Sequence, residues 1–489
     1  MRKHFEILFK DTLLYGLSSA VNKSVWIILV PILARVFSPA EYAVIDVNIA
    51  FYTIVSTFLF LGLDSSLVRF YYKFDNAGES RMVTSTILLS EAAILAAACA
   101  VIFFFSSEIS FLLFKTKDYI RVMKTVILIV PFFILYNFFL NILRCKFERL
   151  KFLILSLGAS LVQAVLTLFL VLSRKTGIIG IFDAILYSQA VFTVLGFLMT
   201  KEEYSFKFSW PLLKDVLGFG IPSLGRSFSQ TLIFFADRFF LVTLVPLHMV
   251  GLYSMGARIA SVINMIILGF ILAWSPFALS IQRYADVKQT YSKVLTYYMV
   301  AGSTISIVLF LLSSEILRII SPSYNGAEIV IGILAYGYML TGAYSIICIG
   351  VTITGQAVHI AWPSLLGVLI NVTAYLILIP VFGILGAALS SLIANVSSLL
   401  FLFWITQKYY TVNYETVKLG KLSLICLTAF IAATFINSSF SLGHAFILKM
   451  MTFLGYLTFL VAADIVNRKE ISRLAAMFKI VGLNAFSGQ

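Results

Sequence analysis

The sequence predicts an all-α polytopic membrane protein with about 14 transmembrane helices, in two six-helix pseudo-symmetric halves followed by two C-terminal helices. Of its 489 residues, 61% are hydrophobic and only 12% are charged, whereas charged residues make up about a quarter of an ordinary soluble domain. The apolar runs recur along the whole chain and are about 20 residues long, the length of a helix that crosses a bilayer. Strands of a transmembrane barrel would be about half as long and would alternate strictly. The composition therefore excludes a soluble protein and favours helices.

We expect the spans, in chain order, at residues 12–36, 41–66, 83–106, 120–143, 152–173, 178–199, 214–244, 250–274, 293–313, 327–353, 361–381, 384–406, 420–437 and 444–463. The connections are short, and the longest outer one, near Ser107–Ile120, is expected to be a loop. With the N-terminus inside, the inner segments carry more than twice as many Lys and Arg residues as the outer loops. This is the positive-inside pattern, so both termini are expected in the cytoplasm. No cleavable signal peptide is expected.

An internal repeat divides the chain. Gly177-Ile178-Ile179-Gly180 opens the sixth span, and Gly383-Ile384-Leu385-Gly386 opens the twelfth. Gly16 corresponds in the same way to Gly220, and Tyr42 to Tyr253. The expected parts are residues 1–205 and 206–412, which are the two halves, and residues 413–489, which hold the two additional helices and the tail. Parallel repeats of this kind are typical of transporters, whose substrate site lies between the halves.

Several segments resemble the Wzx-type polysaccharide and O-antigen flippases, a branch of the multidrug/oligosaccharidyl-lipid/polysaccharide exporter superfamily. They are Leu29-Val30-Pro31-Ile32-Leu33-Ala34-Arg35, Ser38-Pro39-Ala40-Glu41-Tyr42, Leu61-Gly62-Leu63-Asp64, Gly220-Ile221-Pro222, Asp237-Arg238, Gly251-Leu252-Tyr253-Ser254 and Phe382-Gly383-Ile384-Leu385-Gly386-Ala387-Ala388. Ala43 departs from the pattern, where the family usually has glycine.

The resemblance implies a 12-helix core with a V-shaped cavity between the halves, plus two C-terminal helices. It implies transport of undecaprenyl-diphosphate-linked oligosaccharide across the bacterial inner membrane, with a polysaccharide polymerase and assembly proteins as partners. No cofactor and no nucleic acid are implied. Coupling to a proton gradient, a sodium gradient or the membrane potential is left open.

Charged residues inside the apolar spans point to the interior of the protein, because a charge at the bilayer centre costs about 2.5–3.5 kcal/mol on insertion scales. Asn22-Lys23 in the first span aligns with Arg226-Ser227 in the seventh under the repeat, so each half has a cation on the same turn, and Arg258 lies in the eighth span. We expect these three cations, with Asn22 and Gln230, to bind the diphosphate or an anionic sugar, since guanidinium groups and ammonium groups suit phosphate oxygens. The alternative is internal pairing, for instance of Arg258 with Asp46.

Four acidic residues are candidates for gating or ion coupling: Asp46, Asp64, Glu91 and Asp237. Asp46 and Asp64 continue a polar face along the second span. Glu91 is interpreted equally well as a proton or cation site and as a residue with a structural partner. For Asp237, an ion pair with Arg238 at the outer helix end is favoured over a ligand role.

No metal or catalytic constellation is expected. The four Cys and four His residues lack ligand spacing, and the loops are too short to present the acids of a membrane glycosyltransferase or polymerase. A channel is disfavoured because no filter-like segment occurs. The main alternative to a flippase is a cation-coupled multidrug exporter of the same superfamily, which would favour an acidic cavity. The sequence does not identify the glycan.

Overall fold

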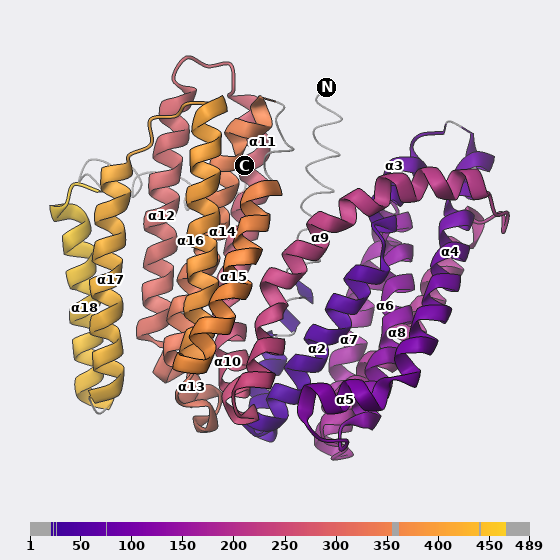
Figure 1. Ribbon diagram of the computed structural model, residues 1–489, viewed down its shortest axis with the longest axis horizontal. Helices are drawn as coiled ribbons and strands as arrows, with labels where there is room; N and C mark the ends of the chain where they lie inside the picture. The colour runs from indigo at the N-terminus through magenta and orange to yellow at the C-terminus, as the bar shows by residue number, and fades with distance from the viewer. Residues whose placement is uncertain are drawn as a thin grey trace, which may run out of the picture. The chain divides into compact units, whose positions relative to one another are not determined.

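The computed structural model describes residues 21–465 except 23, 26, 75, 355–360 and 440–441, and it describes them as helices and short connections (Figure 1). By their contacts the chain divides into two compact units. Unit 1 comprises Met1–Met255, Ile319–Tyr324 and Val368–Ser390, and unit 2 comprises Gly256–Arg318, Asn325–Gly367 and Ser391–Gln489.

The helices up to the end of the seventh predicted span are α2 (Pro39–Leu59), α3 (Leu63–Tyr71), α4 (Ala77–Phe104), α5 (Ser106–Phe114), α6 (Ile120–Cys145), α7 (Arg149–Leu168), η1 (Phe169–Ser173), α8 (Ile178–Thr200), η2 (Lys201–Glu203) and α9 (Trp210–Leu244). The later helices are α10 (Leu247–Ala260), α11 (Ile263–Ser280), α12 (Val287–Leu311), α13 (Ser313–Ile320), η3 (Pro322–Tyr324), α14 (Glu328–Ile353), α15 (Ala361–Phe382), α16 (Ile384–Tyr409), α17 (Thr416–Ser439) and α18 (Leu442–Ala462).

Among the described residues, 12 helices are long and apolar enough to cross a membrane. They fall on every predicted span except the first and the seventh, so the polytopic helical fold is confirmed. Of the first predicted span, the described part includes a shorter apolar helix, Ile27–Val36. The seventh is the 35-residue helix α9. It is long enough to span a membrane, but its apolar sequence contains charged residues such as Arg226 and Arg238. The total of fourteen remains a prediction.

Two predicted features are wrong in detail. The span expected at 41–66 is broken, because α2 ends at Leu59 and α3 begins at Leu63 after two residues with positive φ, Leu61 (50°) and Gly62 (70°). The loop expected near Ser107–Ile120 contains α5 instead.

The start of α2 explains the sequence of one family-like segment, Ser38-Pro39-Ala40-Glu41-Tyr42. Ser38 is the N-cap and Pro39 occupies the first turn. The Ser38 amide donates to Glu41 Oε2 at 2.9 Å, and the Glu41 amide donates to Ser38 Oγ at 3.4 Å. This reciprocal capping box satisfies two amides that would otherwise lack helical partners. The segment therefore marks where α2 begins.

The element order agrees with the internal repeat. Gly177 precedes α8 with φ of 70°, and Gly383 precedes α16 with φ of 59°. A further match joins the short helices α5 and α13, which open with Ser106-Ser107-Glu108-Ile109 and Ser313-Ser314-Glu315-Ile316. The same sequence in the same place after a long helix supports a duplication of the chain.

In unit 1, α9 packs on both α2 and α3. The approach is closest at the α2–α3 break, where a Cβ added to Gly62 would lie 2.0 Å from the Gly220 carbonyl oxygen. Ser66 Oγ donates to the carbonyl of Val216 at 2.8 Å. Gly251 similarly allows α10 to contact Pro39, whose carbonyl oxygen would lie 1.7 Å from an added Cβ. Glycines thus bring α2, α9 and α10 into backbone contact.

Unit 2 has its own apolar core, in which α11, α12, α14 and α17 meet. The C-terminal helices α17 and α18 run side by side (Figure 1). The hydroxyl of Tyr456 on α18 lies 3.0 Å from Ser303 Oγ and 3.1 Å from Thr304 Oγ1 on α12. The two additional helices are therefore part of unit 2 and not a separate element.

We predict that Gly62→Ala destabilises the protein by more than about 2 kcal/mol, because the left-handed conformation strains a side chain and the methyl group would collide with Gly220. The unfolding midpoint in detergent micelles measures this. Gly177→Ala keeps only the strain, since nothing lies within 4 Å of its added Cβ, and should cost about 1–2 kcal/mol. Gly218→Ala, in open space on α9, should be neutral or stabilising by up to about 1 kcal/mol. Equal midpoints for Gly62→Ala and Gly218→Ala would contradict the contact.

Candidate functional site

A buried ionic network joins α2, α9 and α10 in unit 1. Arg238 Nε donates to Asp46 Oδ2 at 3.0 Å, and Arg238 Nη1 donates to the two carboxylate oxygens of Asp237 at 2.6 and 2.7 Å. Tyr253 Oη donates to Asp237 Oδ2 at 2.5 Å. The three ions are only 3–6% exposed. One guanidinium group therefore connects two carboxylates from different helices.

Because this network is buried, it strongly constrains how α2 packs on α9. Each buried ion loses several kcal/mol of solvation, which is recovered only with good pairing and further hydrogen bonds. Arg238 also donates to the Phe234 carbonyl at 2.8 Å and lies over the rings of Phe235 and Tyr253, 5.5 and 5.7 Å from their centroids. The network fixes the distance between α2 and α9.

The sequence predicted only part of this arrangement. The expected pair of Asp237 with Arg238 forms, and it is buried. Asp46 forms an ion pair with Arg238, which the sequence did not suggest, and the suggested pair of Asp46 with Arg258 stays a prediction. No spacing rule connects Asp46 with Arg238, because they meet only through the packing of α2 on α9. A gating role for Asp46 and Asp237 remains a prediction.

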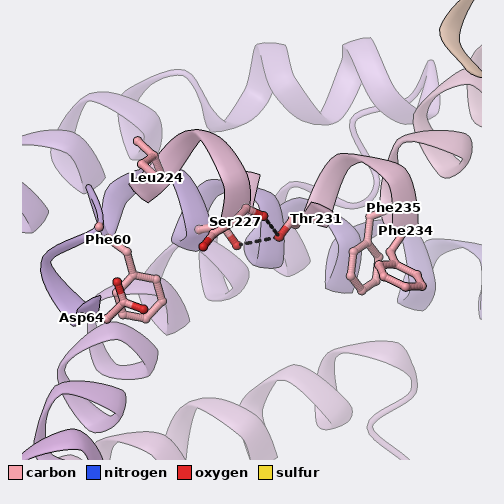
Figure 2. A pocket seen from close by; sticks show the side chains of 9 residues that line it. Phe60, Asp64, Leu224, Ser227, Thr231, Phe234 and Phe235 are labelled. Atoms are coloured by element: carbon pink, nitrogen blue, oxygen red, sulfur yellow. Dashed lines mark hydrogen bonds between the residues drawn. The ribbon is translucent and has the colours of Figure 1, made fainter. Parts of the chain in front are cut away.

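A cavity of about 330 Å³ lies beside the α2–α3 break, against α9 (Figure 2). It is lined by Thr57, Phe60, Gly62, Asp64, Leu224, Ser227, Thr231, Phe234 and Phe235. Thr57 Oγ1 and Thr231 Oγ1 lie 3.3 Å apart, and Thr231 donates to the Ser227 carbonyl at 3.0 Å. Asp64 and Phe60 come from the break, and Ser227 and Thr231 come from α9 (Figure 2). The cavity thus has hydroxyl and carboxylate groups on an otherwise aromatic wall.

Glu91 lies on α4 and is 2% exposed. Its Oε2 atom has no hydrogen-bond partner within the described part of the chain. Asp64, on the neighbouring helix α3, lines the cavity. A coupling role for Glu91 and Asp64 remains a prediction.

The predicted substrate-binding residues are described only in part. Lys23 lies outside the described residues, and so do the side chains of Arg226 and Gln230, although their backbone belongs to α9. Asn22 has a buried Oδ1 without a partner in the described region. Arg258 is half-buried on α10, and its carbonyl accepts from Ser261 Oγ at 2.7 Å. The cationic patch remains a prediction.

The sequence reasoning missed a buried ion pair in unit 2. Lys449 on α18 is 3% exposed and donates to Glu315 at 2.8 and 2.9 Å and to Ser314 Oγ at 2.6 Å. The sequence signal for the acidic partner is the Ser-Ser-Glu-Ile repeat, which places Glu315 in the first turn of α13. Burial raises the pKa of Glu315, but the hydrogen bonds and charge of Lys449 outweigh it and hold the pKa below its ordinary value.

No group of three or more His, Cys, Asp and Glu residues in the described ranges could hold a metal ion. The arrangement instead offers hydroxyl groups, buried carboxylates, and a cavity with a partly polar lining within a helical bundle. Such groups bind polar or charged ligands and protons.

Comparisons with known proteins agree with this picture. A model of the polysaccharide biosynthesis protein family matches residues 8–282. No curated protein sequence matches. A structure of the lipid II flippase MurJ in an inward closed conformation has 16% identity and a TM-score of 0.71, and the match covers 93% of this chain and 100% of that chain.

Two structures of multidrug resistance MATE family transporters of the MOP superfamily are also similar. The inward-facing one has 15% identity and a TM-score of 0.63, with 81% of this chain and 94% of that chain covered. The outward-facing one has 14% identity and a TM-score of 0.56, and the match covers 81% of this chain and 93% of that chain. At these identities the likeness establishes the fold.

We predict that Arg238→Met lowers stability by about 3–5 kcal/mol, because it removes the guanidinium group that pairs with the buried carboxylates of Asp46 and Asp237. Asp46→Asn should cost less, about 1–3 kcal/mol, because Arg238 keeps its pair with Asp237. The double variant should lose less than the sum of the two single losses. Thermal unfolding of the purified protein in detergent measures all three. Asp215→Asn, an exposed position of α9, is the matched control and should change little. Additive losses in the double variant would show that the pair is not coupled.

The lowered pKa of Glu315 predicts a pH-dependent contribution of its pair with Lys449. A carboxylate with a lowered pKa stabilises the folded state above its unfolded pKa and loses this contribution as the pH falls through its folded pKa. The difference in unfolding midpoint between wild type and Glu315→Gln should be largest near neutral pH, begin to shrink below the ordinary carboxyl pKa of about 4.3, and vanish below the lowered folded pKa. Glu108→Gln, at the matching exposed position of α5, should show no such convergence. A difference for Glu315→Gln that is constant with pH would contradict the assignment.

Proposed function

Because this chain belongs to the polysaccharide biosynthesis protein family, we propose that it is a flippase for a lipid-linked glycan. The proposed substrate is undecaprenyl-diphosphate-linked oligosaccharide, moved from the cytoplasmic to the outer leaflet of the bacterial inner membrane. The observation that carries the proposal is the family match over more than half of the chain. The chain is a membrane transporter of this family and not an enzyme, and it shares the fold of a lipid II flippase.

The proposed architecture has fourteen spans with both termini in the cytoplasm. Residues 1–205 and 206–412 form two six-helix halves, and residues 413–489 add two helices and the tail. It is supported by 12 observed candidate spans, by the charge distribution of the loops and by the repeated glycines before α8 and α16. Alternating access between the halves would move the sugar head group while the polyprenyl tail stays in lipid. A polymerase and assembly proteins are the proposed partners.

The proposed substrate site is cationic. Lys23, Arg226 and Arg258, with Asn22 and Gln230, would bind the diphosphate or an anionic sugar. Arginine and lysine suit this role because guanidinium groups bind phosphate oxygens in pairs and an ammonium group supplies a compact charge. An inside-negative potential favours the outward movement of about two negative charges, and at 100 mV it would contribute on the order of 4–5 kcal/mol.

A gating role is proposed for Asp46 and Asp237. Their shared partner, Arg238, connects α2 and α9 through a buried guanidinium group. Alternating access requires an element with two arrangements, and an ion pair that exchanges partners supplies such an element.

A cation-coupled multidrug exporter is the second candidate. It is favoured by the likeness to MATE transporters and by the acidic residues Asp64 and Glu91. Uptake of a cationic dye into liposomes containing the protein distinguishes the two functions: dye transport without movement of the lipid-linked glycan would support the exporter.

We predict that Arg226→Ala and Arg258→Ala abolish flipping and leave membrane insertion intact, because each removes a cation from the substrate site. Flipping is measured in liposomes by the exposure of the glycan to an added lectin. Arg226→Lys should retain part of the activity because it keeps the charge. Lys214→Ala, at an exposed position of α9, is the control and should flip normally. Full flipping activity in both arginine variants would contradict the proposed cationic substrate site.

A further inference from the structure

One membrane segment occurs twice in the chain, and its two copies have different surroundings. Val101-Ile102-Phe103-Phe104-Phe105-Ser106-Ser107-Glu108-Ile109 joins α4 to α5, and Val308-Leu309-Phe310-Leu311-Leu312-Ser313-Ser314-Glu315-Ile316 joins α12 to α13. The segments share the valine, the first phenylalanine and the Ser-Ser-Glu-Ile sequence, and in both a long helix is followed by a short one. These helix pairs are the α4–α5 copy and the α12–α13 copy. Their matching sequence and local fold place equivalent side chains at equivalent positions.

The α12–α13 copy is covered by the two C-terminal helices, which pack on α12 (Figure 1). The ring of Phe310 stacks on Phe430 of α17, with the ring centroids 5.1 Å apart. Lys449 Nζ of α18 lies 2.8 Å from Glu315 Oε1 and donates to Ser314 Oγ at 2.6 Å. The contact therefore combines a stacked aromatic ring with an ion pair at the end of the long helix.

The equivalent face of the α4–α5 copy is not covered by any of the described helices. Phe103 is 38% exposed, whereas its counterpart Phe310 is 2% exposed, and the neighbouring Phe104 is 80% exposed. Glu108, the counterpart of Glu315, is exposed and makes no ion pair in the described part of the chain. Only 28% of the membrane-spanning stretch of α4 is buried, against 50% of that of α12. The shared sequence thus has a helical partner in one copy and lacks one in the other.

The rest of the exposed face of α4 suits close packing against a helix. It is made of small residues, all exposed: Ala92, Ala93, Ala96, Ala97 and Ala100. Ala96 and Ala97 lie two turns before Phe103 and Phe104 and therefore on the same face. In lipid, helices associate through close packing of small residues and through polar contacts between side chains, because apolar surface alone gives no preference for protein over lipid tails. The alanines permit close approach, and the carboxylate of Glu108 supplies the polar contact.

We propose that the α4–α5 copy is the docking site for a transmembrane helix of another membrane protein, one that carries a lysine or arginine at the level of Glu108. Charge complementarity specifies this occupant, because Glu315 takes an ammonium group at the equivalent position. An aromatic side chain of the partner stacks on Phe103, as Phe430 stacks on Phe310. The basic residue does not come from α18 of a second copy, because Lys449 is 3% exposed and is held by its own chain.

The first test measures binding of a synthetic peptide with the sequence of α18 to the full-length protein in liposomes, by energy transfer between fluorophores. The protein's own α18 keeps the α12–α13 copy occupied, so the added peptide reports on the α4–α5 copy. Glu108→Gln should weaken binding about fivefold or more, because it removes the charge that pairs with the peptide's lysine. Glu108→Lys should bind a Lys449→Glu peptide as wild type binds the original.

Glu79→Gln is the matched control, since Glu79 is an exposed acid in the first turn of the same helix, α4. It should bind the peptide like wild type. Equal binding by wild type and Glu108→Gln would overturn the proposal, as would a charge-swapped pair that fails to bind.

The second test identifies the occupant in native membranes. A photoreactive benzoyl-phenylalanine is placed at position 104, and in a control protein at position 194, where Val194 is an exposed residue of α8. Position 104 should cross-link to a different membrane protein through a helix that carries a lysine or arginine, position 194 should not, and Glu108→Gln should reduce the product. A cross-linked pair of two copies of this chain, or labelling of lipid alone, would overturn the proposal. Neither test measures transport, so each stands if the flippase proposal fails.

Discussion

The need to neutralise charge in an apolar interior governs this structure. Asp46, Asp237 and Arg238 lie within helices that are otherwise made of aromatic and aliphatic residues, and each is almost completely buried. Such groups are stable only in contact with one another, so they determine which helices must be neighbours. In unit 2 the pair of Lys449 with Glu315 performs the same task for α18. Charge thereby specifies contacts that apolar packing alone, which tolerates many arrangements, would leave undefined.

Glycine contacts supply what the ion pairs require. A hydrogen-bonded ion pair needs its atoms within about 3 Å, and helices with large side chains at their interface cannot approach so closely. At Gly62 and Gly251 the backbone of one helix touches the backbone of the next. The segments that resemble the flippase family include both glycines. In this structure Gly251 lets α10 approach the start of α2, and Gly62 lets the α2–α3 break approach α9 at the end of the interface away from Arg238.

The sequence predicted the features that depend on local composition. The apolar runs located all twelve observed candidate spans, and the glycine motifs at Gly177 and Gly383 located two helix starts with the same unusual backbone. It did not predict the pairing of Asp46 with Arg238, because residues from different helices meet only through tertiary packing. The break at Gly62 was missed for a related reason: its flanking residues are as apolar as those of a continuous helix, and the positive φ follows from contact with Gly220.

The interface of α2 with α9 has different chemistry at its two ends. At one end, Arg238 neutralises two carboxylates, and this contact is stable as long as the ions stay dry. At the other end, Gly62 brings the α2–α3 break against Gly220, and Asp64 lines a cavity with Thr57, Ser227 and Thr231. Ions therefore stabilise one end of the interface, and close backbone contact beside a polar cavity forms the other. Because α9 is one helix from Trp210 to Leu244 with Pro222 inside it, both kinds of contact act on the same element.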